Sequence, residues 1–140
     1  MPAKDLYHDT VRRALEKDGW TITDDPLDLN YHGTPMYADL GAERVLGAQR
    51  GKRRIAVEIK TFLGASSLFE FHLALGQYGN YRRVLRRRRP RRHLYLAISE
   101  DVYRTVFQVD FMRLAVAEDG INLLVFDPES EVINQWIKIS

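Results

Sequence analysis

Asp39, Glu58 and Lys60 are the residues whose types and spacing could do chemistry. Only one residue separates Glu58 from Lys60, and side chains at i and i+2 project from the same face when the segment is a strand. Carboxylates hold hard divalent cations through oxygen, and a neighbouring Lys can stabilise charge on a phosphate or position a water. With Asp39 nearby, this set predicts a site for metal-dependent cleavage of a phosphodiester.

A simpler interpretation of Glu58 and Lys60 is an ion pair on the surface of a strand. Such a pair contributes only about 0–1 kcal/mol to stability and requires nothing else of the sequence. Asp39 could likewise be an ordinary turn residue before Gly41. Each simple interpretation explains part of the set, whereas the metal site explains all three residues.

Two β-like segments must position these side chains. Gly51 and Lys52 separate them, which predicts a hairpin over residues 37–62. Alternation along the second strand places Glu58 and Lys60 on one face and Ile59 on the other, in the core. Asp39 is expected near the first strand of this hairpin.

The other segments predict an α/β protein. A first helix, with Asp5 as its N-cap, is expected to end at Gly19, and a long helix is expected to open at Ser66 or Ser67 and to run until Pro90. Residues 94–99 form a nearly uninterrupted apolar run, which is typical of a strand buried on both faces. A helix with a break near residue 109 and two final strands follow. The expected architecture is a central mixed sheet flanked by helices.

The composition indicates one domain. The 140 residues are 45% hydrophobic, which suffices for one core and is too little for two ordinary domains, so we expect a single domain over residues 1–140. The chain has no Cys, which excludes a disulfide framework, a thiolate zinc site and a thiol nucleophile. No apolar run approaches the roughly 20 residues of a membrane span, and no secretory signal is apparent, so we expect a cytoplasmic protein without membrane contacts.

Arginines gather between residues 82 and 92, in the stretch YRRVLRRRRPRRH, although the formal net charge of the chain is only +2. Clustered cations bind polyanions by displacing the counterions of phosphates. The alternative is the solvated C-terminal end of a helix, where cations are favoured by the helix dipole. A basic segment does not distinguish DNA from RNA. The residues expected to bind nucleic acid are Arg82, Arg83, Arg86, Arg87, Arg88, Arg89, Arg91 and Arg92.

Asp39 followed by the triplet 58–60, Glu-Ile-Lys, resembles the PD-(D/E)XK nucleases, a superfamily that includes restriction endonucleases and Holliday-junction resolvases. Gln77 and Tyr81 match the Q-x-x-x-Y arrangement of its RecB-like branch, and His8 lies on the first helix, where that branch often has a histidine. The alternative for Gln77 and Tyr81 is a polar helix edge beside the core, and for His8 a surface or hydrogen-bonded histidine.

This resemblance implies a restriction-endonuclease-like sandwich and a catalytic role for six residues. Asp39 and Glu58 would hold Mg²⁺ or Mn²⁺, and Lys60 would orient the attacking water or stabilise the phosphate. Nuclease-fold proteins of this size often dimerise to address both strands of a duplex, so a homodimer is expected by analogy. The implied catalytic set is His8, Asp39, Glu58, Lys60, Gln77 and Tyr81.

Nearly the whole chain is similar to the XisH family, whose name denotes a controlling factor for excision of the fdxN element in cyanobacteria. This resemblance implies a DNA-recombination factor, with DNA and a site-specific recombinase or second excision factor as partners. Its activity would be metal-dependent endonuclease cleavage, or, alternatively, non-catalytic DNA binding that assembles a recombinase. The stretches that carry the similarity are MPAKDLYHDTVRRALEKDGWTITDDP, MYADLGAE, IAVEIKTFLG, FHLALGQYGNYR and LYLAIS.

Overall fold

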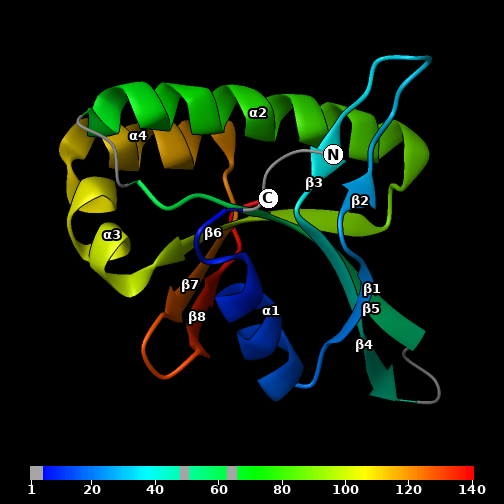
Figure 1. Cartoon of the computed structure of the whole chain (residues 1–140). Helices are drawn as coiled ribbons and strands as arrows, with labels where there is room; N and C mark the ends of the chain where they lie inside the picture. The colour runs from blue at the N-terminus through cyan, green and yellow to red at the C-terminus, as the bar shows by residue number, and fades with distance from the viewer. Residues whose placement is uncertain (1–4, 48–50, 63–65) are drawn as a thin grey trace.

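The apolar segments of the chain form a six-stranded mixed sheet with helices on both faces (Figure 1). This computed structural model describes residues 5–47, 51–62 and 66–140. The strand order is β1-β4-β5-β6-β7-β8; β5, β6 and β7 run parallel to one another, and the outer pairings are antiparallel. The strands are β1 (Thr21–Asp24), β4 (Leu40–Gly47), β5 (Gly51–Ile59), β6 (Arg92–Ser99), β7 (Leu123–Asp127) and β8 (Val132–Ile137).

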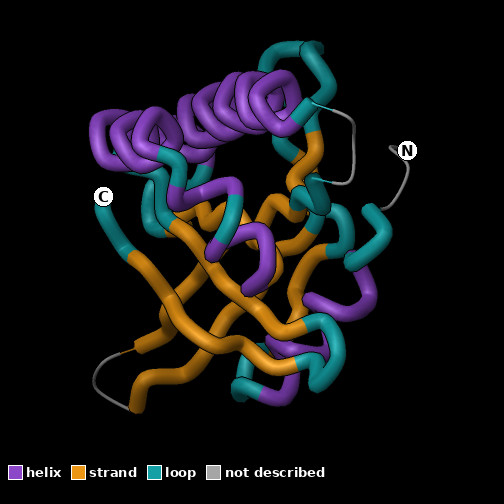
Figure 2. The backbone as a smooth tube through the Cα atoms, turned by 90° about the vertical axis from the view of Figure 1, so that its left-hand side faces the viewer, coloured by secondary structure: helices purple, strands orange, loops and turns teal. Residues whose placement is uncertain are grey.

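Helices cover the two faces unequally. One face carries the long α2 (Ser67–Arg88) together with α3 (Glu100–Arg104), the short 3-10 helix η1 (Val106–Gln108) and α4 (Asp110–Asp119). The other face carries α1 (His8–Lys17). Figure 2 shows α2 lying across one side of the sheet. None of the helices in the described residues is both long and apolar enough to span a bilayer.

The two hydrophobic clusters lie on opposite faces of β5 and β6. Phe71 and Tyr78 of α2 pack with Leu96 of β6 in one cluster, whereas Leu15 of α1 packs with Val57 of β5 in the other. Because both faces of the central strands are covered, these strands read as continuous apolar runs. The predicted central mixed sheet with flanking helices is confirmed.

Local signals predicted most element boundaries. Ser66 is the N-cap of α2, where its hydroxyl accepts a 3.2 Å hydrogen bond from the Phe69 N–H, and Gly120 ends α4 with φ +63°. The predicted Asp5 cap is wrong. The first helix begins at His8, and Asp5 instead accepts a 2.9 Å hydrogen bond from the Tyr7 N–H and a hydrogen bond from the Thr61 hydroxyl.

A hairpin arm, residues 27–38, leaves the sheet and passes across the C-terminal half of α2 (Figure 1). It contains β2 (Leu27–Asp28) and β3 (Tyr37–Ala38), which pair antiparallel. Leu27, Leu29 and Ala38 are buried in the cluster beneath α2. Arg88 of α2 fastens the arm by donating to the main-chain carbonyls of Asp28 (3.2 Å) and Asn30 (2.8 Å). The residue that follows the arm directly is Asp39.

Candidate active site

Asp39, Glu58 and Lys60 meet at the carboxyl end of β5. The pairing of β4 with β5 sets Leu40 opposite Val57, so the preceding Asp39 reaches the end of β5. There an Asp39 carboxylate oxygen accepts a 2.7 Å hydrogen bond from the Ile59 N–H. Lys60 Nζ lies 3.5 Å from Glu58 Oε2. Ligand sites of parallel sheets lie outside the carboxyl ends of the strands, and this set occupies such a position.

The two carboxylates are largely withdrawn from solvent. The exposed fraction of the side chain is 7% for Glu58 and 17% for Asp39. The interpretation of Glu58 and Lys60 as a surface ion pair is therefore wrong, because a buried carboxylate carries a desolvation cost that a surface pair avoids. A second carboxylate beside it raises that cost further.

Burial raises the pKa of Glu58 to about 9, and the negative charge of Asp39 adds to the effect, whereas Lys60 lowers this pKa. Burial also raises the pKa of Asp39, against the hydrogen bond from the Ile59 N–H, which lowers it. Ionising both of two adjacent carboxylates away from water has a high cost in free energy. At neutral pH the protein on its own therefore keeps a proton on Glu58. Strong perturbation of this kind is typical of functional sites.

His8 approaches the carboxylates from α1, on the other side of the sheet. Its Nε2 lies 2.7 Å from an Asp25 carboxylate oxygen, and its buried Nδ1 has no hydrogen-bond partner and lies 4.0 Å from Asp39 Oδ1. Burial would raise the pKa of Asp25, but hydrogen bonds from Arg12 and His8 outweigh it and lower this pKa. Asp25 thus fixes the imidazole with Nδ1 towards Asp39. Sequence reasoning missed Asp25, because nothing in its local pattern signals a partner 17 residues earlier.

Tyr81 and Gln77 approach from α2. Burial, together with the charges of Glu58 and Asp39, raises the pKa of Tyr81 to about 12, which places the phenol within the field of the two carboxylates. Gln77 lies one turn earlier on α2, and its side-chain oxygen is buried without a hydrogen-bond partner. Tyr81 therefore belongs to the carboxylate site, and Gln77 has an unused acceptor on the same helix.

A pocket of about 250 Å³ opens beside Lys60. Its lining includes two further carboxylates, Asp5 and Glu70, and the charge of Asp5 contributes to the raised pKa of Asp39. Asp5 was predicted only as a helix cap, and Glu70 lies in the first turn of α2. The pocket gives a small anionic ligand or a water access to Lys60, with Thr61 and Phe62 on its wall.

The donor set fits a hard divalent cation. In the described part of the chain, no group of three His, Asp or Glu side chains is arranged to hold a metal ion. However, the buried Glu58 Oε1 has no hydrogen-bond partner, and a cation between two carboxylates would supply that partner and offset their repulsion. The Ile59 carbonyl is a further oxygen donor on the Asp39 side, because the N–H and C=O of a strand residue point to the same edge.

The arginine run is divided between structural contacts and solvent. Arg82 donates to the carbonyls of Asp119 (2.6 Å) and Gly120 (3.3 Å) at the end of α4, and Arg88 fastens the hairpin arm. Arg89 is half-buried. The exposed members are Arg83, Arg86, Arg87 and Arg91, together with the partly exposed head of Arg88.

Arg92 is corrected from a phosphate-binding residue to a structural one. Its side chain is only 7% exposed, its Nη1 donates a 2.9 Å hydrogen bond to the Ile55 carbonyl, and its Nη2 lies 3.7 Å from Asp24. Residue 92 opens β6, so its side chain enters the sheet layer rather than solvent. A guanidinium held in this way is not available to DNA.

Fold and site together define a mixed α/β protein whose central parallel strand ends in a buried carboxylate pair and a lysine. The chain belongs to the XisH family, because the family model described as "XisH protein" matches residues 1–134. No curated protein matches the chain significantly.

Two crystal structures are similar to this chain over almost its whole length. An XisH family protein from Nostoc punctiforme PCC 73102 is 48% identical with a TM-score of 0.87, covering 96% of this chain and 100% of that one. An fdxN element excision controlling factor protein from Anabaena variabilis is 46% identical, also with a TM-score of 0.87 and the same coverage.

Proposed function

We propose that this protein is a DNA-processing factor with a PD-(D/E)XK-type nuclease site, which hydrolyses phosphodiester bonds with Mg²⁺ or Mn²⁺ during excision of a DNA element. The observation that carries the proposal is the buried Asp39–Glu58 pair beside Lys60. Support for the excision role comes from the similar Anabaena variabilis protein, which is described as an fdxN element excision controlling factor. A homodimer would bring two such sites to the two strands of a duplex.

In the proposed reaction a water oxygen bonds to phosphorus and releases a proton to solvent, the bond to the bridging deoxyribose oxygen breaks, and the leaving oxygen takes up a proton. Asp39 and Glu58 would hold the divalent cation, which would supply Lewis acidity at the phosphate. Lys60 stabilises the phosphate charge or orients the water, since its ammonium lies beside Glu58 at the edge of an open pocket. The carboxylates are largely withdrawn from water, so charges fixed at this site interact with the phosphate more strongly than they would in solvent.

The remaining residues position this set. Tyr81, with a pKa of about 12, stays protonated at physiological pH, so its hydroxyl can donate to a phosphate or to a carboxylate. The unpaired side-chain oxygen of Gln77 can accept a hydrogen bond from water. His8, held by Asp25, limits the movement of Asp39.

Cleavage of supercoiled, single-stranded and four-way-junction DNA in Mg²⁺ or Mn²⁺ tests the proposal. We expect the wild type to cut at least one form and Lys60→Gln to cut it about 10²–10³-fold more slowly, as when one charge-stabilising donor is removed. Lys52→Gln is the matched control, because Lys52 lies on the same strand but is exposed and pairs with Glu43 at 3.1 Å. Equal loss of rate in both variants would contradict the role of Lys60.

Cation affinity is expected to increase with pH. Glu58, with a pKa of about 9, must lose its proton before it can serve as a ligand, so the apparent association constant for Mn²⁺ should rise up to about tenfold per pH unit between pH 6 and 8. Calorimetric titration of chelator-treated protein in buffers of different ionisation enthalpy would report the released proton. An affinity that does not change with pH would argue against Glu58 as a ligand.

A second function is favoured by the exposed, basic C-terminal end of α2. In this alternative the protein binds DNA through exposed arginines such as Arg86 and Arg91 and assembles a site-specific recombinase without cutting. DNA binding by the wild type, with no cleavage of any DNA form, would support this function and reject hydrolysis. A recombinase or second excision factor would then be the partner.

A further inference from the structure

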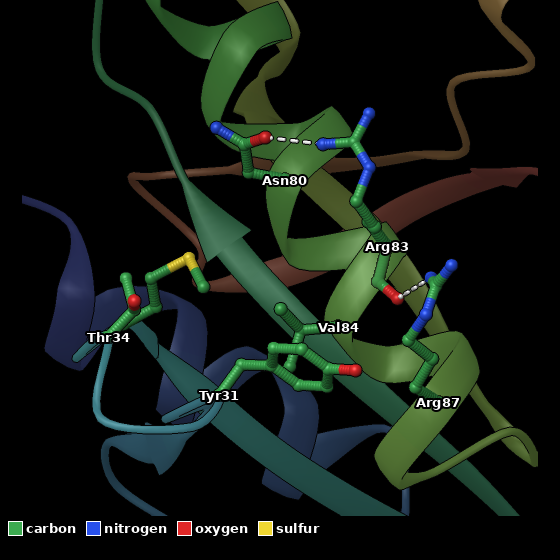
Figure 3. A pocket seen from close by; sticks show the side chains of 7 residues that line it. Tyr31, Thr34, Asn80, Arg83, Val84 and Arg87 are labelled. Carbon is green, nitrogen blue, oxygen red and sulfur yellow. Dashed lines mark hydrogen bonds between the residues drawn. The ribbon is translucent and has the colours of Figure 1, made fainter.

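A pocket of about 480 Å³ lies between the hairpin arm and α2 (Figure 3), and its lining does not include Asp39 or Glu58. Its volume is in the range of sites that hold small organic groups, about 300–1,000 Å³. The arm contributes an aromatic and a thioether side chain, and α2 contributes a valine, an amide and two guanidinium groups. The lining residues are Tyr31, Thr34, Met36, Asn80, Arg83, Val84 and Arg87.

The tip of the arm presents Tyr31 in a fixed position. Tyr31 and Thr34 exchange two main-chain hydrogen bonds of 3.0 Å, and the two residues between them, His32 and Gly33, have φ +48° and +89°. Positive φ at both central residues is the requirement of a type I′ turn, which suits a tight hairpin. The Tyr31 ring packs against the cluster beneath α2 and is only partly buried. The turn therefore fixes the position of the Tyr31 ring at the pocket.

Arg83 and Arg87 supply positive charge that no carboxylate among the described residues neutralises. Arg83 Nη1 donates a 2.6 Å hydrogen bond to the Asn80 side-chain oxygen, and Arg87 Nη1 donates a 3.0 Å hydrogen bond to the Arg83 carbonyl (Figure 3). Neither arginine forms an ion pair within the residues that the structure describes, and both are exposed. Their remaining N–H groups are directed by these bonds but are free to meet an anion.

The pocket and the carboxylate site are joined by two elements. On the arm, Met36 of the pocket precedes Asp39 by three residues, and on α2, Asn80 of the pocket is adjacent to Tyr81 of the site. A chain molecule with regularly spaced anionic groups could therefore lie in both at once. An aromatic face can stack only with a base that is not paired, because paired bases are already stacked within a duplex.

We propose that this pocket binds an unpaired nucleotide of a DNA strand, with the base against Tyr31 and the flanking phosphates at Arg83 and Arg87. The inference rests on the proposed function for the identity of the polymer, and it adds a preference for single-stranded or distorted DNA. Asn80 lies where its amide can meet the edge of the base.

Binding of a fluorescein-labelled 12-nucleotide strand to the full chain in EDTA tests the proposal, because cleavage is then suppressed. Tyr31→Leu keeps an apolar side chain but removes the aromatic face, and we expect it to weaken binding on the order of tenfold, whereas Tyr31→Phe should bind like the wild type. A strand of the same length with abasic sites keeps the phosphates and should not respond to Tyr31→Leu.

The salt dependence of binding measures the contribution of the two arginines separately from that of the Tyr31 ring. Arg83→Gln with Arg87→Gln should lower the magnitude of the slope of log K against log salt by about 0.7 for each lost phosphate contact. Arg104→Gln is the control for charge alone, because Arg104 lies on α3 and pairs with Glu100 at 3.8 Å.

Two results would overturn the proposal: unchanged binding by Tyr31→Leu in a variant that melts like the wild type, or wild-type affinity for the intact strand that equals its affinity for the abasic strand or for blunt duplex. A parallel cleavage assay with Lys60→Gln keeps the two proposals apart. If cleavage requires Lys60 and binding is unchanged by Tyr31→Leu, only the proposal for the pocket is rejected. Binding that depends on Tyr31 without any cleavage retains the pocket and rejects hydrolysis.

Discussion

Replacing Glu58 with Gln is expected to raise the free energy of unfolding by several kcal/mol at pH 8 and to abolish metal-dependent cleavage. The pKa of Glu58 is about 9 in the folded protein, chiefly through burial and then through Asp39, against about 4.3 in an unfolded chain. Between these values the folded state holds one proton more than the unfolded state. The stability of the wild type therefore falls by up to about 1.4 kcal/mol per pH unit as the pH rises through this window.

Gln is similar in shape to protonated Glu and has no proton to lose, so the variant should lack this slope. Urea unfolding at pH 5 and pH 8 would show a difference between variant and wild type that is small at pH 5 and large at pH 8. Glu43→Gln is the control, since Glu43 lies on β4 and pairs with Lys52 at the far end of the same hairpin. A constant difference at both pH values would mean that Glu58 is ionised in the fold.

Replacing Arg92 with Met is expected to lower the free energy of unfolding by about 3 kcal/mol and to leave the salt dependence of DNA binding unchanged. The substitution keeps apolar bulk but leaves the Ile55 carbonyl without this donor and the Asp24 carboxylate without the guanidinium charge that lies 3.7 Å away. Gly41 shows how tightly the guanidinium is enclosed, because a Cβ on Gly41 would lie 2.5 Å from Arg92 Nη1.

Arg91→Met is the matched control, because Arg91 is the exposed neighbour of Arg92 in the same run. Its loss should change stability by less than about 0.5 kcal/mol. If it contacts a phosphate of duplex DNA, the magnitude of the salt slope should fall by about 0.9. Equal destabilisation by both substitutions, or a lower salt slope with Arg92→Met, would contradict the structural role of Arg92.

Features set by neighbours along the chain were predictable from the sequence. The alternation around Glu58 predicted the β4–β5 hairpin, and the spacing of Glu58 and Lys60 predicted their common face. Gly51 and Lys52, which were predicted to separate the two strands, are instead the first residues of β5. The turn of that hairpin, over residues 48–50, lies outside the described residues. Ser66 and Pro90 correctly predicted the two ends of α2, because side-chain capping by Ser66 and the missing N–H of Pro90 both act locally.

Features set by packing between distant elements were not predictable. Within a run of arginines, Arg92 differs from Arg91 only because β6 lies beside β5, which brings the Ile55 carbonyl within reach of residue 92. In the same way, His8 gains Asp25 as a partner only when α1 packs on the sheet. The pocket at Tyr31 depends on the arm passing across α2, and no spacing in the sequence indicates that contact.

The hairpin arm gives this small protein a part that can vary without disturbing the rest. Its base is anchored twice, by the buried Leu27 and Leu29 and by Arg88, whereas its tip is closed by its own Tyr31–Thr34 turn. Residues at the tip contact α2 from outside and contribute nothing to the Asp39–Ile59 bond. A protein engineer could therefore graft a longer or differently charged tip to change the proposed DNA binding, with the carboxylate pair at β5 left intact.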